Sequence, residues 1–371
     1  MSRAEIAQTL DVSPSTVTKA VKPLIDDGYL EELTGERSRA RSQAPVLGRP
    51  SQRLQVNKAR HAAVGIKVRP DRLIGVLTDL RTEIRDYRTV SLTDRSPGTV
   101  LGAVEELALE LADGGGTADD HVLGLGVSIS GHVDAAQKTC RYSALLGWHD
   151  VEIADRLHAR TGLRTVVSND VNALTVGERW FGEGRDYQTF VVITMGTGIG
   201  CGLFLNGRLF TGGFGMAGEI GHVPVQPDGP RCNCGRHGCL EAVASYDAVL
   251  RGITERGGPV CADIDMAIDL ARSDDGPAGA AAVAAFSDAG DALGRALASL
   301  CNLFNPQKLI LAGEGVKARG LFGPSMEAAL RAHTFSSAAD DCDLTSILID
   351  DADWARGAAC LVVHTELGSL A

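Results

Sequence analysis

Hydrophobic residues recur at helical spacing twice within residues 2–33, with a short turn between the two stretches. The first apolar face comprises Ile6, Ala7 and Leu10, and the second comprises Val17, Val21, Leu24 and Ile25. Ser13 is a favoured N-cap residue, and Pro14 suits the first position of the second helix. Gly28 ends that helix, and a strand opens at Tyr29. The pattern therefore predicts two short helices and a strand, the arrangement of a helix-turn-helix module.

The remainder of the chain alternates between strand-like and helix-like patterns. Strands are predicted at 64–66, 73–77, 87–92, 122–129, 165–170, 190–195, 202–210 and 308–313, and helices at 97–112, 171–181 and 279–304. Antiparallel strands come first, strands alternating with helices follow, and this order occurs twice. The sequence therefore predicts a duplicated α/β fold with a cleft between its two halves.

The composition is that of a soluble globular protein, with 44% hydrophobic and 22% charged residues. A chain of 371 residues suggests two or three domains. The N-terminal sequence has no hydrophobic segment of the signal-peptide type, and no apolar run is long enough to cross a bilayer. We therefore expect a cytoplasmic protein with no membrane partner.

Charge is distributed unevenly along the chain. The formal net charge of −11 argues against non-specific binding of polyanions by the molecule as a whole. Residues 1–56 nevertheless contain eight Lys and Arg against seven Asp and Glu, whereas the rest contains 28 against 40. Within 33–56, a single acidic residue, Glu36, accompanies Arg37, Arg39, Arg41, Arg49 and Arg53. A basic segment on an acidic protein indicates a local contact with nucleic acid.

We predict that residues 1–57 form a winged helix-turn-helix domain that binds DNA. The second helix of this motif lies in the major groove, with its N-terminal residues nearest the bases. The residues expected to contact DNA are Ser13, Ser15, Thr16, Thr18 and Lys19, together with Arg49 in a predicted β-wing. Winged helices of this kind normally have a further helix before the one near Ser2, and this chain begins too late to contain it. The alternative is a helical hairpin that packs on the larger domain without contacting DNA.

Cysteines cluster in the segment CNCGRHGC, ten residues after a histidine. Cys232, Cys234, Cys239 and His222 form the ligand set of a closed tetrahedral zinc site, and the intervening glycines allow a tight fold. A disulfide or a redox-active CxC pair is the alternative, but nothing in the sequence suggests secretion. Because Glu219 and Glu241 lie in the same stretch, the metal would support a loop that carries carboxylates.

Several motifs occur in an order that resembles the ROK family of sugar kinases and sugar-responsive repressors. They are LGWHDVEIADRL (146–157), NDVNAL (169–174), GTGIGCG (196–202), GFGMAGEIGH (213–222), CNCGRHGCLE (232–241) and LAGEGV (311–316). The resemblance covers about residues 60–365 and implies an actin-like (ribonuclease H-like) two-lobed domain over 60–371. It also implies a hinge near 180–190, a C-terminal helix that returns to the first lobe, and zinc beside a sugar-binding cleft. A preceding winged helix is the mark of the repressor branch.

The same resemblance assigns sugar contacts to Asn169, Asp170, Glu219, His222 and Glu241. Amides and carboxylates suit this task, because they hydrogen-bond vicinal hydroxyls of a hexose in a fixed geometry. The family's general base falls on Asp170, where capping of a helix is the structural alternative. His222 would use one ring nitrogen for zinc and offer the other to a sugar hydroxyl.

Residues 67–72 bear on whether the chain is a kinase. Kinases of the family have an Asp-x-Gly-Gly-Thr-Lys turn here that holds ATP phosphates. In this chain Lys67 stands at the Asp position, Arg69-Pro70-Asp71 replace Gly-Gly-Thr, and Arg72 stands at the Lys position. Pro70 lacks an N–H group, and side chains replace glycines that would let phosphate approach. Because phosphoryl transfer depends on positioning and charge stabilisation, we expect little or no kinase activity.

The sequence thus predicts a sugar-responsive transcriptional regulator of the repressor type. It would bind operator DNA as a homodimer or homotetramer and bind a sugar or sugar phosphate in the zinc-braced cleft. A glucokinase-like, ATP-dependent sugar kinase and a sensor that does not bind DNA are the alternatives. The sequence does not specify the sugar, or whether sugar releases DNA or promotes its binding.

Overall fold

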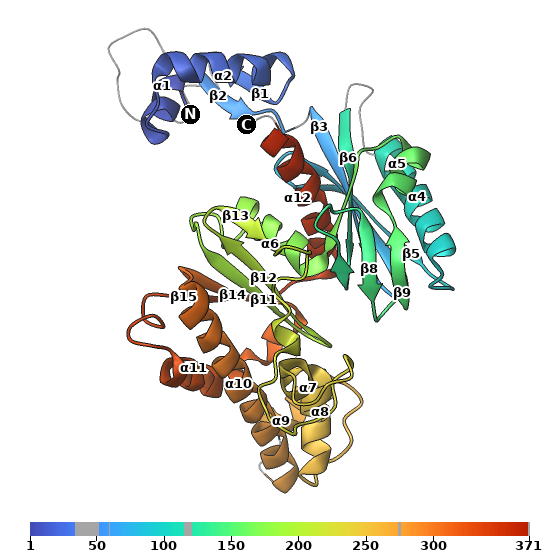
Figure 1. The fold of residues 1–371 in the computed structure, drawn as a ribbon, viewed down its shortest axis with the longest axis vertical. Coiled ribbons are helices and arrows are strands. Elements are labelled where there is room, and N and C mark those ends of the chain that lie inside the picture. Colours follow the sequence, from blue (N-terminus) through green and yellow to red (C-terminus); the bar gives the residue numbers. More distant parts are fainter. Residues whose placement is uncertain (34–51, 59, 115–120, 274–275, 370–371) are drawn as a thin grey trace.

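The computed structural model describes residues 1–33, 52–58, 60–114, 121–273 and 276–369 (Figure 1). Its first part is a small module made of α1 (Arg3–Thr9), α2 (Pro14–Asp26), β1 (Leu30–Leu33) and β2 (Arg53–Val56). The two strands pair antiparallel, with Leu30 opposite Val56. The predicted helices and first strand are therefore confirmed. The basic residues Arg37, Arg39, Arg41 and Arg49 lie outside the described residues.

Caps and a small core hold this module together. Ser2 and Glu5 form a reciprocal capping box at the start of α1, and Ser13 accepts a hydrogen bond from the Thr16 backbone N–H at the start of α2. Gly28 has φ +82°, which lets the chain leave α2 and turn into β1. The buried residues between the helices and the strands are Ala7, Val17, Val21 and Leu54.

The first lobe is built on a five-stranded sheet with the order β10-β6-β3-β4-β5. Its strands are β3 (His61–Val68), β4 (Arg72–Asp79), β5 (Ile84–Ser91), β6 (His121–Ile129) and β10 (Thr165–Asn169). One face packs on α4 (Pro97–Gly114) and α5 (Ala154–Thr161). A second, three-stranded sheet of β7 (His132–Val133), β8 (Thr139–Ser143) and β9 (Trp148–Glu152) was not predicted, because its strands are short and largely polar.

The second lobe repeats this plan with the order β13-β12-β11-β14-β15. Its strands are β11 (Phe190–Met195), β12 (Ile199–Leu205), β13 (Arg208–Phe210), β14 (Lys308–Ala312) and β15 (Asp343–Ile347). The helical segments are η1 (Ile220–His222), α7 (Leu240–Ala244), α8 (Tyr246–Glu255), α9 (Ile264–Ser273), α10 (Pro277–Phe304), η2 (Glu314–Ala318) and α11 (Arg319–His333). In each lobe three antiparallel strands are followed by two parallel ones, so the predicted duplication is confirmed.

One predicted strand needs correction. Residues 202–210 were expected to be extended throughout, but the chain reverses within them. Asn206 and Gly207 both have positive φ, at +52° and +80°, so β12 and β13 form a hairpin. An Asn-Gly pair is the strongest sequence signal for a two-residue hairpin turn, and it overrides the hydrophobic alternation.

Two helices join the lobes. α6 (Asp170–Phe181) leaves the first sheet, and the chain then enters the second sheet at Phe190. After β15 the chain returns, and α12 (Asp351–Ser369) covers the face of the first sheet opposite α4 and α5 (Figure 1). A β-carbon on Gly65 would lie 2.2 Å from the Ala355 carbonyl oxygen, so glycine there allows α12 to pack directly against β3. Among the described residues, no helix is long and apolar enough to cross a membrane.

Candidate functional site

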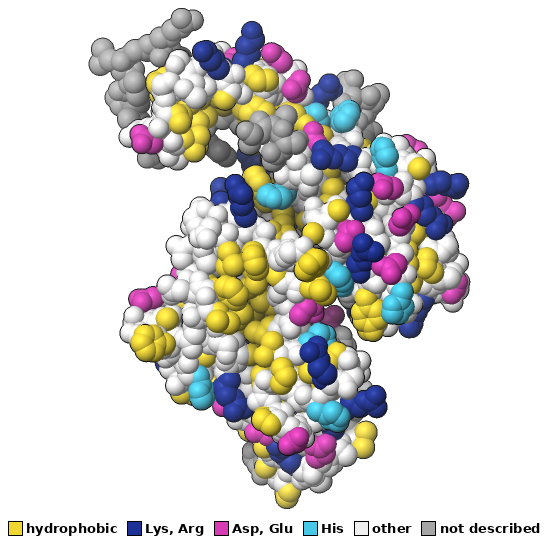
Figure 2. Space-filling view, viewed as in Figure 1, with side chains coloured by type: hydrophobic (Ala, Val, Ile, Leu, Met, Phe, Trp, Pro, Cys, Tyr) yellow, Lys and Arg dark blue, Asp and Glu magenta, His cyan; other side chains and the backbone are white. Residues whose placement is uncertain are grey.

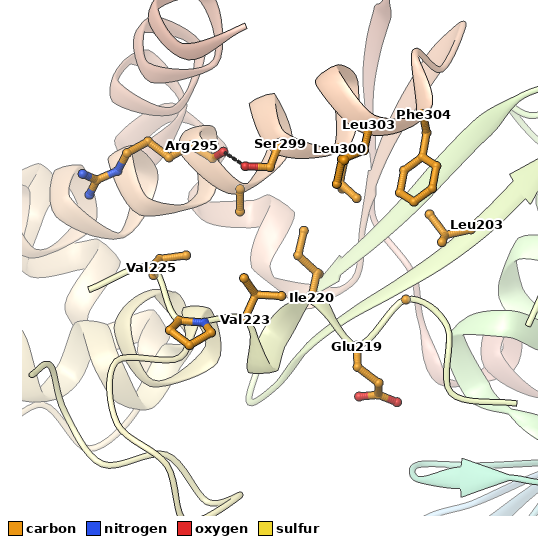
Figure 3. A pocket seen from close by; sticks show the side chains of 13 residues that line it. Leu203, Glu219, Ile220, Val223, Val225, Arg295, Ser299, Leu300, Leu303 and Phe304 are labelled. Atoms are coloured by element: carbon orange, nitrogen blue, oxygen red, sulfur yellow. Dashed lines mark hydrogen bonds between the residues drawn. The ribbon is translucent and has the colours of Figure 1, made fainter. Parts of the chain in front are cut away.

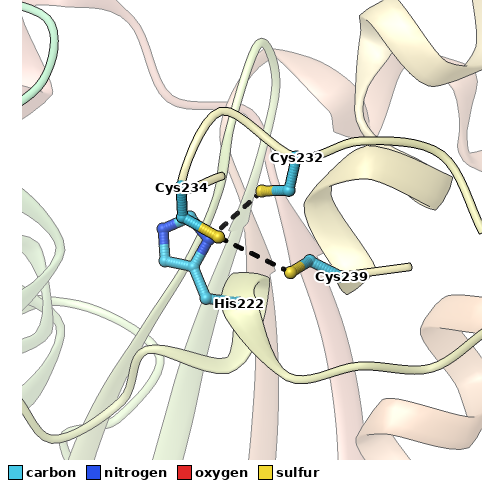
Figure 4. A group of neighbouring side chains, drawn as sticks. All are labelled: His222, Cys232, Cys234 and Cys239. Atoms are coloured by element: carbon cyan, nitrogen blue, oxygen red, sulfur yellow. Dashed lines mark hydrogen bonds between the residues drawn. The ribbon is translucent and has the colours of Figure 1, made fainter. Parts of the chain in front are cut away.

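Four metal-binding side chains converge in the second lobe (Figure 4). The ligand atoms of His222, Cys232, Cys234 and Cys239 all lie within 4.8 Å of one another. The Nδ1 atom of His222 is 3.5 Å from the sulfur of Cys232, and the sulfurs of Cys234 and Cys239 are 3.7 Å apart. Around a tetrahedral zinc ion, bond lengths of about 2.3 Å to sulfur and 2.0 Å to nitrogen give edges of roughly 3.8 and 3.5 Å. The four residues therefore fit a closed structural zinc site.

The loop around this cluster is held by its backbone. Short antiparallel bridges join Pro224 to Cys239 and Arg231 to His237. Gly238 has φ +69°, and a β-carbon there would lie 1.7 Å from the Gln226 carbonyl oxygen. A larger residue at this position would displace the loop and separate its thiols.

The three thiols of the cluster differ in pKa: burial raises the pKa of Cys232 and of Cys239, whereas the pKa of Cys234 is lowered. Burial disfavours the thiolate of Cys234, but hydrogen bonds from Arg236 outweigh burial and lower the pKa of this thiol. A lowered thiol pKa favours the thiolate form that binds metal. All cysteines that the structure describes are free thiols.

At the carboxyl end of β10, Asn169 and Asp170 begin helix α6. Asn169 is the N-cap: its Oδ1 accepts from the N–H groups of Val171 and Asn172 at 2.9 and 3.3 Å. Its Nδ2 donates to the Gly131 carbonyl at 3.0 Å. Capping is thus performed mainly by Asn169, while Oδ1 of Asp170 also accepts from the Val171 N–H at 2.9 Å.

Asp170 is paired with a buried lysine. The Lys67 ammonium donates to Oδ2 of Asp170, and their side chains are 6% and 12% exposed. The hydroxyl of Ser130 donates to the same oxygen at 2.5 Å and lies 3.2 Å from the Lys67 nitrogen. Burial lowers the pKa of Lys67, and the neighbouring Asp170 carboxylate opposes this effect.

Sequence reasoning missed this pairing, although a signal was present. Lys67, Ser130 and Asp170 lie at the carboxyl ends of β3, β6 and β10. These three strands are adjacent and parallel, so polar residues at their ends meet at one sheet edge. The face of Trp354 also lies 5.3 Å from the Lys67 nitrogen, a contact from α12 that no local pattern indicates.

The remaining sugar-contact candidates lie on the facing lobe. The Nε2 atom of His222 is 4.0 Å from a carboxylate oxygen of Glu219, so the ring can face metal with one nitrogen and Glu219 with the other. Oε2 of Glu241 accepts from the backbone N–H of Ile199 at 3.2 Å, within the predicted glycine-rich motif. Surrounding protein raises the pKa of Glu219, and the charges of Asp170 and Glu241 add to the effect. The charges of Asp170 and Glu241 both act on Glu219, so the three carboxylates lie within electrostatic range of one another. Figure 2 shows a hollow between the two lobes on this face of the molecule.

The segment that carries Glu219 has a second, apolar side. Ile220, Val223 and Val225 line a groove of about 440 Å³ against α10, where Leu300 and Phe304 complete the wall (Figure 3). The Glu219 side chain points away from these residues (Figure 3). The groove offers few hydrogen-bonding groups, so it does not suit a sugar.

The turn between β3 and β4 is tied to α12. Nη1 of Arg69 donates to Oδ1 of Asp351 at 2.8 Å, and Nη2 of Arg72 donates to Oδ2 at 2.7 Å. Burial acts to raise the pKa of Asp351, but the two guanidinium groups outweigh it and lower the pKa. Arg72 also pairs with Asp71 at 2.5 Å. The cationic groups of residues 67–72 therefore already have carboxylate partners.

In the N-terminal module, the predicted DNA-facing residues are all exposed: Ser13, Ser15, Thr16, Thr18 and Lys19. Their four hydroxyls all make local hydrogen bonds, and those of Ser15 and Thr16 each pair with Ser13 Oγ at 2.8 Å. Ser13 Oγ accepts from the Thr16 N–H at 3.1 Å, and Thr18 donates to the Pro14 carbonyl at 2.9 Å. Ser15, Thr16 and Lys19 project from the first turns of α2, where a major-groove contact would form.

Comparison with known proteins identifies the fold. The ROK family profile matches residues 63–365, and an iron-dependent repressor N-terminal DNA-binding domain profile matches residues 1–33. The chain belongs to the ROK family. It combines a ROK domain with an N-terminal DNA-binding domain, as the resemblance predicted.

Relatives of both functional types are similar to the chain. A glucokinase of Thermotoga maritima is 35% identical over 270 residues, covering 68% of this chain and 82% of that protein. A xylose repressor of Bacillus subtilis is 26% identical over 363 residues, covering 98% and 91%. The crystal structure of a ROK family transcriptional regulator, a homologue of the E. coli MLC protein, has a TM-score of 0.84 and 26% identity, covering 99% of this chain and 93% of that one. The matches to regulators extend over the DNA-binding domain, whereas the glucokinase match does not span the whole chain.

Proposed function

We propose that this protein is a sugar-responsive transcriptional regulator that has lost sugar kinase activity. The DNA-binding domain would bind an operator, and a sugar or sugar phosphate would bind between the lobes. The full-length similarity to repressors, together with the exposed first turns of α2, supports the DNA-binding half of the proposal. A symmetric dimer reading two half-sites is the expected operator complex.

One observation carries the loss of catalysis: Lys67 pairs with Asp170. A general base must accept a proton from the sugar hydroxyl, and the Lys67 ammonium already occupies Oδ2 of Asp170, the oxygen that would take this proton. Ser130 and the Val171 N–H occupy further acceptor positions on the same carboxylate. Asp170 would then bind sugar without deprotonating it.

The sugar would lie between Asn169 and Asp170 on one lobe and Glu219, His222 and Glu241 on the other. Zinc bound by His222, Cys232, Cys234 and Cys239 would act structurally, because a site with four protein ligands leaves no open position. It would fix the loop that carries Glu219 and orient the His222 ring. Contacts to both lobes would couple sugar binding to their closure.

Two measurements test the proposal. Purified protein supplied with ATP and with glucose, xylose or N-acetylglucosamine should show no ADP production above background. The same protein should shift a duplex selected from a random-sequence library, and one of the sugars should change that affinity. Efficient phosphorylation of any of these sugars would overturn the loss of kinase activity. Absence of salt-sensitive, sequence-selective DNA binding would overturn the regulator function.

A further inference from the structure

The first turn of α12 lies where the chain returns from the second lobe to the first. Residues 348–350 make the crossing, and Asp351 is the first residue of the helix. Its carboxylate bridges Arg69 and Arg72 in a fork of two charge-assisted hydrogen bonds. One turn further, Trp354 packs against a hydrophobic cluster that includes Phe190, Phe204 and Ile310 of the second sheet. This turn therefore contacts both lobes at their hinge.

The same turn also contacts the proposed sugar site. Trp354 lies against the Lys67 ammonium, which in turn pairs with Asp170. Lys67 and the Arg69–Arg72 turn are consecutive along β3 and its hairpin. A change in the angle between the lobes would therefore act directly on Asp351 and Trp354.

The far end of α12 reaches the DNA-binding domain. The hydroxyl of Tyr29 donates to Oε1 of Glu366 at 3.4 Å, and Leu24 and Leu367 pack at the edge of the same cluster as Tyr29. At 1.5 Å per residue, the helix carries the contact about 22 Å from Asp351 to Glu366.

Between its ends α12 is held rigidly. A β-carbon on Gly126 would lie 1.9 Å from the Ala358 carbonyl oxygen, and one on Gly357 would lie 3.1 Å from the backbone of Ala173 in α6. Such close backbone packing joins α12 and the first-lobe sheet into one rigid unit. A change in the orientation of this unit at its hinge end would then reach Glu366 without being absorbed within the helix.

We propose that the Asp351 fork is the latch through which the sugar cleft controls the DNA-binding domain. The residues that replace the phosphate-binding turn, Arg69 and Arg72, bind a carboxylate of the same chain. That internal carboxylate fastens the hinge end of α12 to the first lobe. Asp351 is a positioning residue: it contacts neither sugar nor DNA but transmits the state of the cleft. This inference rests on the proposed regulator function.

The test uses the full chain with Asp351→Asn, which keeps the side-chain shape and removes the charge. Three quantities are measured: sugar affinity by calorimetry with glucose, xylose or N-acetylglucosamine, operator affinity without sugar, and the ratio of operator affinities with and without saturating sugar. The variant should leave the first two within about twofold and shrink the ratio at least about fivefold. Asp351→Glu should restore part of the ratio. Glu110→Gln, which removes a carboxylate partner of Arg88 elsewhere on the first lobe, should change none of the three.

A second variant tests the proposed coupling at the other end of α12. Glu366→Gln should also reduce the ratio of operator affinities with and without sugar. The double variant Asp351→Asn/Glu366→Gln should reduce this ratio no further than the more severe single variant, because both residues belong to the same pathway of coupling. An unchanged ratio in Asp351→Asn, or a loss confined to sugar affinity, would overturn the latch. If none of the sugars changes the operator affinity of the wild-type protein, the proposed function itself is refuted.

Discussion

The ammonium of Lys67, near the end of β3, lies against the carboxylate of Asp170, which follows β10 on the other side of β6 in the first-lobe sheet. The pair is buried, and its partners come from positions 103 residues apart in the sequence. In the family resemblance, one of these positions belongs to the phosphate turn and the other to the general base. Under the proposed function, their pairing would connect the turn between β3 and β4 to the general-base position in a single contact.

Breaking this pair should be costly. Lys67→Met leaves the Asp170 carboxylate buried without its cation and should destabilise the first lobe by about 3–5 kcal/mol. The double variant Lys67→Met/Asp170→Asn removes both charges and should recover most of that loss. Urea denaturation at neutral pH measures both effects. A double variant no more stable than the single variant would show that the pair is not the source of the loss.

Glu219 offers a clean test of the sugar site. Its carboxylate is exposed and points away from the apolar groove, so Glu219→Gln should fold normally. Loss of charge-assisted hydrogen bonds to sugar hydroxyls should weaken binding by about 1.5–3 kcal/mol, roughly 10- to 100-fold. Calorimetry against the three sugars measures the change, and zinc content should stay constant. Unchanged sugar affinity would remove Glu219 from the site.

The metal assignment predicts a selective loss. Cys234→Ser should abolish stoichiometric zinc binding and lower the unfolding temperature, because a structural zinc site contributes directly to folding. Cys342→Ser, at a half-buried thiol outside the cluster, should retain full zinc content. Elemental analysis of the purified variants measures the zinc content per chain. Retention of one zinc per chain in Cys234→Ser would contradict the four-ligand assignment.

Lys19 is predicted to contact DNA phosphate. Lys19→Ala should weaken binding to all sequences by a similar factor and reduce the slope of log K against log salt by about one. The matched control is Lys138→Ala, which removes an exposed lysine of the ROK domain that pairs with Asp155. Fluorescence anisotropy at several salt concentrations gives both slopes. A changed slope in the control, or none in Lys19→Ala, would exclude this placement of α2.

The junction between the DNA-binding domain and the ROK domain contains a buried histidine. His61 stacks on Tyr29 with ring centroids 4.3 Å apart, and its Nε2 contacts the Asp27 carbonyl at 3.1 Å. Burial lowers the pKa of His61, and the charges of His121 and Arg60 lower it further, while the Asp27 carbonyl and Glu366 act in the opposite direction.

This environment predicts that the junction weakens in acid. Because the folded state holds His61 neutral, the unfolded or undocked state binds the proton more tightly, and stability is lost as pH falls through about 6.5. Limited proteolysis of the region between the domains should accelerate between pH 7.5 and 5.5. His61→Phe keeps the stacking but cannot titrate, so it should flatten this dependence. An equally steep dependence in His61→Phe would assign the effect to another group.

Local sequence patterns alone were enough to predict many of the elements and candidate site residues of this protein. Helical spacing and caps at Ser13 and Pro14 predicted the DNA-binding helices, because these signals lie within a few residues of one another. The cluster that fits a zinc site was equally visible, since Cys232, Cys234 and Cys239 share one loop and His222 lies ten residues before it. The duplicated strand order and the sequence of the turn at residues 67–72 are also local properties of the chain.

Tertiary structure decided which distant groups meet. Nothing near Lys67 in the sequence indicates that its charge would be neutralised by Asp170, or that Asp351 would bind the neighbouring arginines. These contacts depend on which strands are adjacent and on the return of α12 to the first lobe, both set by packing of the whole core. Local sequence determines helices, turns and compact metal loops because their energies involve neighbouring residues. Contacts between remote charges form only when burial of many other side chains has fixed the relative positions of the elements that carry them.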